Sequence, residues 1–206
     1  MNTIYLVRHG ETAHNAGGRG LGREDAPLTA AGRAQALEVA NRFANLPLGV
    51  VLSSPLRRAR DAAELIAGGG GLEVEVMDDL IELDVGTTEG MSFAEMRQRF
   101  PEFMRDWAAA NPIEVCMPGG ERLADLAERT DRVVKRLRAA DGINVAVVSH
   151  NFVIKIMLCQ LLDLPLENFR RFQVDLASVS TVTVRNGRAA VAALNDTCHI
   201  ETLSLA

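Results

Sequence analysis

TIYLVRHGET, residues 3–12, opens the chain with a short apolar run that ends abruptly in charged residues. Such a run is typical of a buried strand. A polar, glycine-rich loop follows, and a helix is expected from Thr29, whose hydroxyl can act as its N-cap. In that helix we expect alanines together with Leu37, Val39 and Phe43 to fill the buried face. A strand followed by a helix is the first unit of an α/β pattern.

The rest of the chain continues to alternate between strand and helix patterns. The continuous valines of NVAVVSH, residues 144–150, are typical of a central parallel strand. Asn186-Gly187 predicts a hairpin turn between two strands in residues 179–194. The glycine run 68–71 is expected to interrupt both helix and strand. Further strands are expected at residues 49–54 and 72–77, and helices at residues 55–67, 92–100, 102–109, 121–139 and 152–162.

This alternation predicts an α/β fold: a three-layer sandwich whose mainly parallel central sheet carries helices on both faces and has an antiparallel edge hairpin. The length of 206 residues fits one domain, residues 1–206. The stretch at about 84–117 is longer than a simple crossover, so we interpret it as an inserted helical lid. Bulky apolar side chains at helical spacings fill it: Phe93, Met96, Phe100, Phe103, Met104 and Trp107.

The composition argues against several classes of protein. A formal net charge of −5 disfavours a nucleic-acid-binding protein, which usually carries a basic face. The N-terminal residues contain no basic leader, and no apolar run approaches the ~20 residues of a membrane span. Neither the three cysteines nor the histidines have zinc-site spacing. We therefore expect a cytoplasmic protein with no membrane or nucleic-acid partner, no metal and no cofactor.

Three predicted strands end in residues that can do chemistry. The first ends in Arg8-His9-Gly10, the second in Ser53-Ser54 shortly before Arg57-Arg58, and the central one in Ser149-His150. Ligands of parallel sheets bind at the carboxyl ends of the strands, so these groups are expected to meet on one rim. Two arginines can hold a phosphate dianion, and a neutral imidazole can attack phosphorus. The pattern therefore favours metal-independent phosphoryl transfer.

Six sequence blocks, in order along the chain, are similar to those of the histidine phosphatase superfamily, which is also called the phosphoglycerate mutase-like fold. They are LVRHGET, DAPLTAAGRAQA, SSPLRRARDAA, LIELDVGTTEG, PGGE and VSH. The resemblance implies that His9 is the phosphorylated nucleophile, that His150 is the second pocket histidine and that Glu82 protonates the leaving group. It also implies the phosphate ligands Arg8, Asn15 and Arg58, to which we add the backbone N–H of Asn151.

Several positions leave alternatives open. Arg57 is expected to be the exposed neighbour of Arg58, whereas Glu11, Asp84 and Glu89 lie in contexts similar to that of Glu82. His14 and His199 match no motif and are expected to be surface or core residues. Glu11 is expected to orient the His9 ring or to cap its loop.

Two departures from the family pattern leave the substrate unnamed. Asn151-Phe152 stand where glycines are common after the second histidine, and Leu21 stands where a glutamine is common. Arg19 fits the family arginine of the same loop. The nature of the leaving group is therefore not specified by the family motifs.

The resemblance implies a phosphatase that acts on a small-molecule phosphomonoester. Phosphoglycerate mutases of the family are longer, so hydrolysis is favoured over mutase activity. A phosphotransferase using the same site is the main alternative, and a non-catalytic phosphate-binding module is another. Because valine-rich sheet edges in such folds often pair, a homodimer is one alternative to a monomer.

Overall fold

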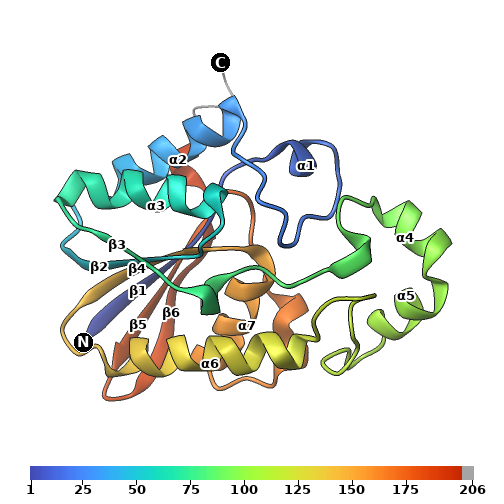
Figure 1. The fold of residues 1–206 in the computed structure, drawn as a ribbon. Coiled ribbons are helices and arrows are strands. Elements are labelled where there is room, and N and C mark those ends of the chain that lie inside the picture. The colour runs from blue at the N-terminus through green and yellow to red at the C-terminus, as the bar shows by residue number, and fades with distance from the viewer. Residues whose placement is uncertain (201–206) are drawn as a thin grey trace.

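A single six-stranded sheet runs through the computed structural model, which describes residues 1–200 (Figure 1). The spatial order of the strands is β3-β2-β4-β1-β5-β6. The first four strands are parallel, whereas β5 is antiparallel to β1 and β6 is antiparallel to β5. The predicted fold class is therefore confirmed. The strands are β1 (Asn2–Arg8), β2 (Leu48–Ser53), β3 (Val74–Val76), β4 (Asn144–Ser149), β5 (Val179–Arg185) and β6 (Arg188–Asp196).

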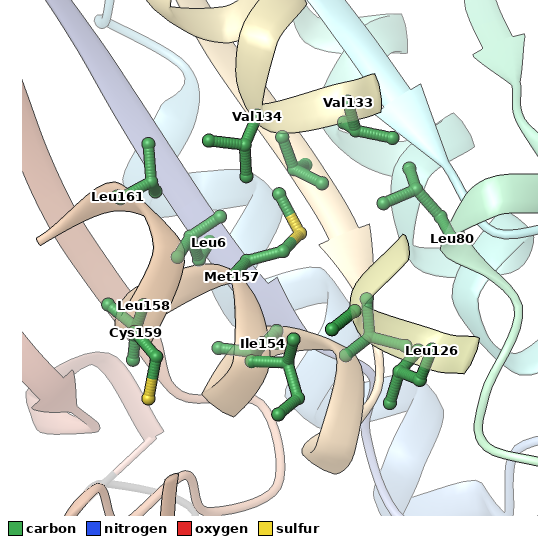
Figure 2. Close-up of a cluster of buried hydrophobic side chains, with 14 of the residues drawn as sticks. Leu6, Leu80, Leu126, Val133, Val134, Ile154, Met157, Leu158, Cys159 and Leu161 are labelled. Carbon is green, nitrogen blue, oxygen red and sulfur yellow. The ribbon is translucent and has the colours of Figure 1, made fainter. Parts of the chain in front are cut away.

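Two pairs of helices cover the two faces of the sheet (Figure 1). Alternate residues of the central strands point to opposite faces, so both faces must be apolar. Val7 and Val148 belong to the core on the side of α2 and α3, whereas Leu6 and Val147 belong to the core on the side of α6 and α7. Figure 2 shows Leu6 among side chains of α6 and α7, including the buried Cys159. The helices are α2 (Ala30–Phe43), α3 (Arg57–Gly70), α6 (Leu123–Ala139) and α7 (Asn151–Leu161).

Helix α2 begins as its sequence predicts but buries a different set of side chains. Thr29 is the N-cap, and its hydroxyl accepts a hydrogen bond from the N–H of Gly32. Val39 and Phe43 are buried, but Leu37 is 49% exposed, so its expected place in the core is wrong. Buried positions 32, 36, 39 and 43 define one face. Leu37 precedes Val39 by two residues, or about 200° of helical rotation, and therefore points to solvent.

The glycine run does not interrupt the helix before it, contrary to expectation. Helix α3 continues through Gly70, and only Gly71 ends it, in the left-handed conformation with φ of 65°. A glycine in this position ends many helices because it has no Cβ to clash. The N–H of Leu72 donates to the carbonyl of Ala67 and so satisfies a group at the helix end. Three helical glycines cost stability, but they do not remove any backbone donor.

The segment between β3 and α6 contains two short helices that extend to one side of the sheet (Figure 1). They are α4 (Phe93–Arg99) and α5 (Pro101–Trp107), and short 3-10 turns precede them at η1 (Asp78–Leu80) and η2 (Gly86–Thr88). The Trp107 ring contacts the rings of Phe152 and Phe169, with centroids 6.0 and 6.3 Å apart. Phe169 lies in η3 (Leu166–Arg171). Aromatic packing therefore joins α5 to the start of α7.

No helix among residues 1–200 has both the length and the apolar character needed to cross a membrane.

The loop after β1 lies directly against the first turn of α2, backbone to backbone. A Cβ built on Gly32 would lie 2.1 Å from the carbonyl oxygen of Glu11, and one built on Gly10 would lie 2.4 Å from the carbonyl oxygen of Gly32. Side chains cannot be accommodated at such distances without a backbone shift. Glycine at these two positions therefore allows the helix to support the loop that follows His9.

A Gly32→Ala variant is expected to lose about 1–3 kcal/mol of unfolding free energy, because the new methyl group meets rigid backbone atoms. Urea unfolding followed by circular dichroism measures the loss. Gly68→Ala is the matched control, since Gly68 is helical and nothing lies within 4 Å of its built Cβ. This control is expected to gain up to about 1 kcal/mol. Equal stabilities for the two variants would contradict the proposed backbone contact.

Candidate active site

The register of two parallel strands brings the two motif histidines together. Arg8 of β1 pairs with Ser149 of β4, so the next residues along each strand, His9 and His150, lie side by side. Their ring centroids are 5.1 Å apart. The N–H of His9 donates to the carbonyl of Ser149 and continues the ladder by one bond. Both rings are almost fully buried, at 3% and 0% exposure.

The His9 ring is oriented by its own loop. Its Nδ1 lies 2.7 Å from the carbonyl oxygen of Gly10, which can only accept, so Nδ1 carries the ring proton. The other nitrogen, Nε2, therefore has a free lone pair. Burial, followed by the positive charges of Arg8 and Arg58, holds the pKa of His9 well below 6.5. The ring is thus neutral and has the protonation state of a nucleophile.

The second histidine is oriented by Ser54, which follows β2. Nε2 of His150 lies 2.7 Å from the Ser54 hydroxyl, and the same hydroxyl accepts a hydrogen bond from the N–H of Leu56. Within residues 1–200 the hydroxyl hydrogen has no other acceptor, so it is directed to Nε2 of His150. Nδ1 then carries the ring proton. Burial and then Arg58 hold the pKa of His150 well below 6.5, so this ring is neutral too.

Two arginines supply positive charge next to the histidine pair. Arg58 is fully buried and donates to the carbonyls of Gly22 (2.6 Å) and Glu24 (2.7 Å). Arg8 donates to the carbonyl of Val174 (2.7 Å). Backbone carbonyls align both guanidinium groups without neutralising them, so they keep their positive charge for an anion.

Two asparagines add amide donors. Asn15 lies in the short helix α1 (Ala13–Ala16), where its Oδ1 accepts from the backbone and hydroxyl of Thr12. This leaves the Asn15 amide NH₂ group available as a donor. Asn151 is the first residue of α7, and the first N–H groups of a helix have no partner within it. Asn15 therefore provides a neutral donor in the hollow that Arg8 lines, and Asn151 provides one directly after His150.

Unsatisfied donors concentrate at this rim. Among residues 1–200, six buried side-chain nitrogen or oxygen atoms have no hydrogen-bond partner, and three of them are Arg8 Nε, Arg58 Nε and His150 Nδ1. A buried donor without a partner costs about 1–3 kcal/mol. An anion that accepted these hydrogens would remove the cost, so the rim has the electrostatics of an anion site. No group of three or more His, Cys, Asp and Glu within the same residues is arranged to hold a metal ion.

Glu82 is the carboxyl group of this rim. It is 4% exposed and accepts hydrogen bonds from the N–H groups of Leu83 (2.8 Å) and Phe152 (3.3 Å). Burial raises the pKa of Glu82 above 4.5, while these hydrogen bonds and the two arginines partly oppose the rise. A bound phosphate dianion would raise it further by like-charge repulsion. Glu82 therefore has the protonation behaviour of a general acid.

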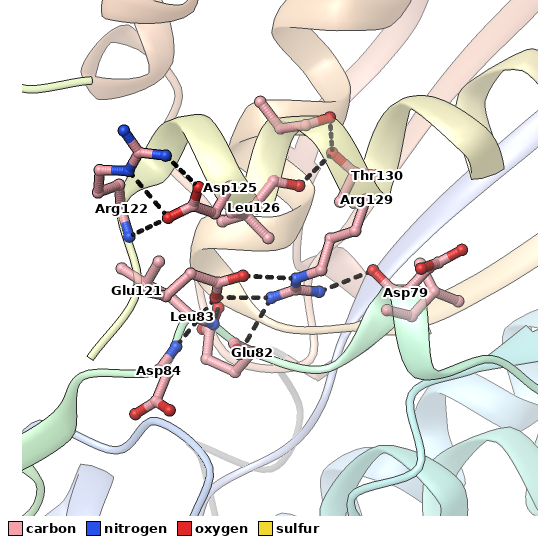
Figure 3. A network of polar contacts seen from close by, with 12 residues as sticks. Asp79, Glu82, Leu83, Asp84, Glu121, Arg122, Asp125, Leu126, Arg129 and Thr130 are labelled. Atoms are coloured by element: carbon pink, nitrogen blue, oxygen red, sulfur yellow. Dashed lines mark hydrogen bonds and ion pairs between the residues drawn. The ribbon is translucent and has the colours of Figure 1, made fainter. Parts of the chain in front are cut away.

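A polar network holds the backbone around Glu82, as Figure 3 shows. Arg129 of α6 donates to the carbonyls of Asp79 (2.7 Å) and Glu82 (3.1 Å) and forms an ion pair with Glu121 (2.9 Å). Glu121 also accepts from the N–H of Asp84. Arg129 and Glu121 are each only 11% exposed, so solvent screens this ion pair weakly. Helix α6 thereby holds in place the segment after η1 that carries Glu82.

The acidic residues in similar sequence contexts have other contacts. Glu89 accepts from the N–H groups of residues 22, 23 and 24, so it holds the loop whose carbonyls align Arg58. Asp84 accepts from the N–H of Gly86 and pairs with Arg23. Glu11 accepts from the Thr29 hydroxyl (2.7 Å), so it caps its loop, and it does not orient His9.

The remaining motif neighbours lie outside the rim. The Arg57 side chain is 65% exposed, as expected for the neighbour of a buried arginine. His14 pairs with the carboxylate of Glu24, and His199 contacts the Ala177 carbonyl through its ring Nε2. Sequence reasoning did not find the Ser54 contact to His150 or the Phe152 contact to Glu82, because both depend on spatial neighbours.

Comparison with known proteins gives the same family over the length of the chain. The profile of the histidine phosphatase superfamily (branch 1) matches residues 4–197. Phosphoserine phosphatase 1 of Hydrogenobacter thermophilus is 36% identical over 201 residues, which cover 97% of this chain and 95% of that protein. An Escherichia coli protein named "Probable phosphoglycerate mutase GpmB" is 32% identical, over 88% of this chain and 85% of its own. The α-ribazole phosphatase of Shigella flexneri superposes with a TM-score of 0.85 at 28% identity, over 95% and 96% of the chains.

Proposed function

The chain belongs to branch 1 of the histidine phosphatase superfamily, and we propose that it hydrolyses a small-molecule phosphomonoester through a phosphohistidine on His9. One observation carries the proposal: a neutral His9 whose Nε2 lone pair is free lies beside three buried donors that have no protein partner. Those donors suit the phosphoryl group of a substrate. The named phosphatases among the relatives support the same reaction class.

The first half-reaction transfers the phosphoryl group to the enzyme. Arg8, Arg58 and Asn15 hold the phosphoryl oxygens, and Nδ1–H of His150 donates to one of them as charge spreads in the transition state. The lone pair of His9 Nε2 forms the new bond to phosphorus while the bond from phosphorus to the leaving oxygen breaks. Glu82 gives its proton to that oxygen, so a neutral alcohol leaves and Glu82 becomes a carboxylate.

The second half-reaction returns the enzyme to its starting state. A water molecule attacks phosphorus from the side that the alcohol has left, and the Glu82 carboxylate takes a proton from it. The bond between phosphorus and His9 breaks, and its electron pair returns to Nε2. Inorganic phosphate then leaves. In this scheme the two arginines provide the positive charge and the neutral His150 ring provides a hydrogen-bond donor, so the scheme uses no metal ion.

The covalent step is tested by rapid mixing with p-nitrophenyl phosphate. We expect a phosphoenzyme, trapped in base, that is lost in acid as a phosphohistidine is, and whose phosphate maps to His9. Steady release of inorganic phosphate should follow. A wild-type enzyme that turns over without ever carrying phosphate on a histidine would contradict the proposal.

The name of the Escherichia coli relative makes mutase activity the second candidate. The same site could return the phosphoryl group to a second substrate instead of water. Assays on 3-phosphoglycerate with and without a bisphosphate primer separate the two, because only a mutase depends on the primer. We expect no primer-dependent isomerisation, and the rate of any phosphate release should not change when the primer is added.

A further inference from the structure

A partly enclosed apolar cavity of about 190 Å³ lies between the α4–α5 segment and the start of α7. Apart from Thr88, every residue that lines it is a glycine or has an aliphatic, thioether or aromatic side chain. Thr88 is 1% exposed, and its hydroxyl already donates to the carbonyl of Val85. Its lining includes Leu21, Val85, Trp107 and Phe152.

This cavity shares its wall with the phosphate rim at three places in the chain. Gly22 aligns Arg58 through its carbonyl, and the preceding residue, Leu21, lines the cavity. Phe152 donates a hydrogen bond from its backbone N–H to Glu82, and Phe152 also lines the cavity. Val85, three residues after Glu82, lines it too. The apolar cavity therefore adjoins the segments that carry Glu82 and align Arg58.

A second hollow near the rim is polar. Its lining includes Arg8, Asn15, Arg19 and Asp175. Glu82 itself lines neither space, but only the apolar cavity is lined by Phe152, whose N–H binds the Glu82 carboxyl group. This contact favours the apolar cavity for a leaving group that Glu82 protonates.

We propose that the cavity binds the alcohol portion of the substrate and that this portion is uncharged and apolar, an alkyl or aryl group. The inference rests on the proposed phosphatase function and names its substrate class. An apolar cavity of about 150 Å³ in another protein holds a benzene molecule, so the volume here suits a single ring or a short chain. A zwitterionic alcohol such as serine would lose its hydration with no opposite charge in the lining to replace it.

The test compares methyl, butyl and hexyl phosphate with O-phosphoserine by phosphate release. We expect kcat/KM to rise about 3- to 4-fold per added methylene until the cavity is full. O-phosphoserine is expected to be at least about 10-fold poorer than butyl phosphate. A flat series, or a preference for O-phosphoserine, would overturn the inference while leaving the phosphatase proposal intact.

A matched pair of variants assigns the preference to the cavity. Leu21→Gln places an amide in its lining and is expected to lower the ratio of kcat/KM for hexyl over methyl phosphate by about 10-fold. Leu37→Gln makes the same change on the exposed face of α2, where the ratio should not move. Equal ratios in the two variants would refute the location.

A binding measurement tests the cavity without any turnover. Trp107 is the single tryptophan of the chain and lines the cavity, so its fluorescence reports on occupancy. Hexylphosphonate, which cannot be hydrolysed, is expected to change the emission and to bind at least about 10-fold more tightly than methylphosphonate. If no ester were hydrolysed, the proposed function would fail. The phosphonate titration would still show whether the cavity binds an apolar group. Equal affinity of the two phosphonates would overturn the inference.

Discussion

A His9→Ala variant is expected to release p-nitrophenol from p-nitrophenyl phosphate at least about 10⁴-fold more slowly than the wild-type enzyme. Alanine removes Nε2 of His9, the atom that forms the covalent intermediate in the proposed mechanism. Water would then have to attack the ester directly, because His150 cannot replace the lost lone pair: its Nε2 is bound by the Ser54 hydroxyl and its Nδ1 carries the ring proton. The measurement is the steady-state rate, together with the amount of phosphate bound to the quenched protein.

His199→Ala is the matched control for this loss. His199 also has a lowered pKa, caused mainly by burial, but it contacts Arg42 and Ala177, not the rim. We expect it to keep turnover within about threefold of the wild-type rate, which is the scatter of substitutions outside a site. Circular dichroism shows whether both variants fold. Retained activity in folded His9→Ala protein would remove the covalent mechanism.

A Glu82→Gln variant is expected to slow the cleavage of alkyl phosphates by about 10²–10⁴-fold, because an alkoxide needs a proton in order to leave. p-Nitrophenolate leaves readily as an anion, so its first turnover should be nearly unchanged. The second step still lacks its base. We therefore expect a burst of one p-nitrophenol per site followed by a slow phase, measured by stopped-flow absorbance.

The pH dependence of kcat/KM tests the protonation states that His9 and Glu82 need for activity. His9 acts as the neutral base form, so activity falls as the pH drops through its lowered pKa, which lies well below 6.5. Glu82 acts as the protonated form, so activity on alkyl esters falls as the pH rises through its raised pKa, above 4.5. In the Glu82→Gln variant, this fall of activity at high pH should disappear. Glu64→Gln, at a side chain that is 58% exposed, should keep it. An equal first-turnover loss on both kinds of leaving group would exclude Glu82 as the acid.

Most elements of the fold could be predicted from local patterns. Short apolar runs predicted β1, β2 and β4 close to their observed bounds, and Asn186-Gly187 turns with φ of 50° and 76°, as a tight hairpin requires. Thr29 caps α2 because a hydroxyl one residue before a helix can accept its free N–H groups. Each of these signals is contained within a few residues, so the rest of the chain is not needed to interpret it.

Burial was harder to predict than secondary structure. Leu37 is as apolar as its neighbours, but the face that α2 buries is chosen by what packs against it. One element of secondary structure was also hard to predict. Gly68, Gly69 and Gly70 have poor helix propensity, but α3 includes them. Tertiary packing of the preceding turns outweighs about 1 kcal/mol per glycine.

The residues of the candidate site divide in the same way. His9, Arg58, Glu82 and His150 could be named from sequence motifs, and all four prove to be buried at one rim. The protonation states of these residues could not be predicted from the motifs, because they depend on the Gly10 carbonyl, on burial and on Ser54. Ser54 is 96 residues from His150 in the chain and meets it only through the register of β2 against β4.

The sequence alone determined the fold class and the family and named the candidate reacting residues, because each is carried by short runs of side-chain chemistry. Only the tertiary structure decided which nitrogen of each imidazole carries the proton, why the pKa of Glu82 is raised, and that an apolar cavity lies next to its segment. These properties come from desolvation and from contacts between segments distant in the chain. TIYLVRHGET therefore contains the proposed attacking group, whereas Leu21, Trp107 and Phe152, brought together by folding, line the cavity proposed for the leaving group.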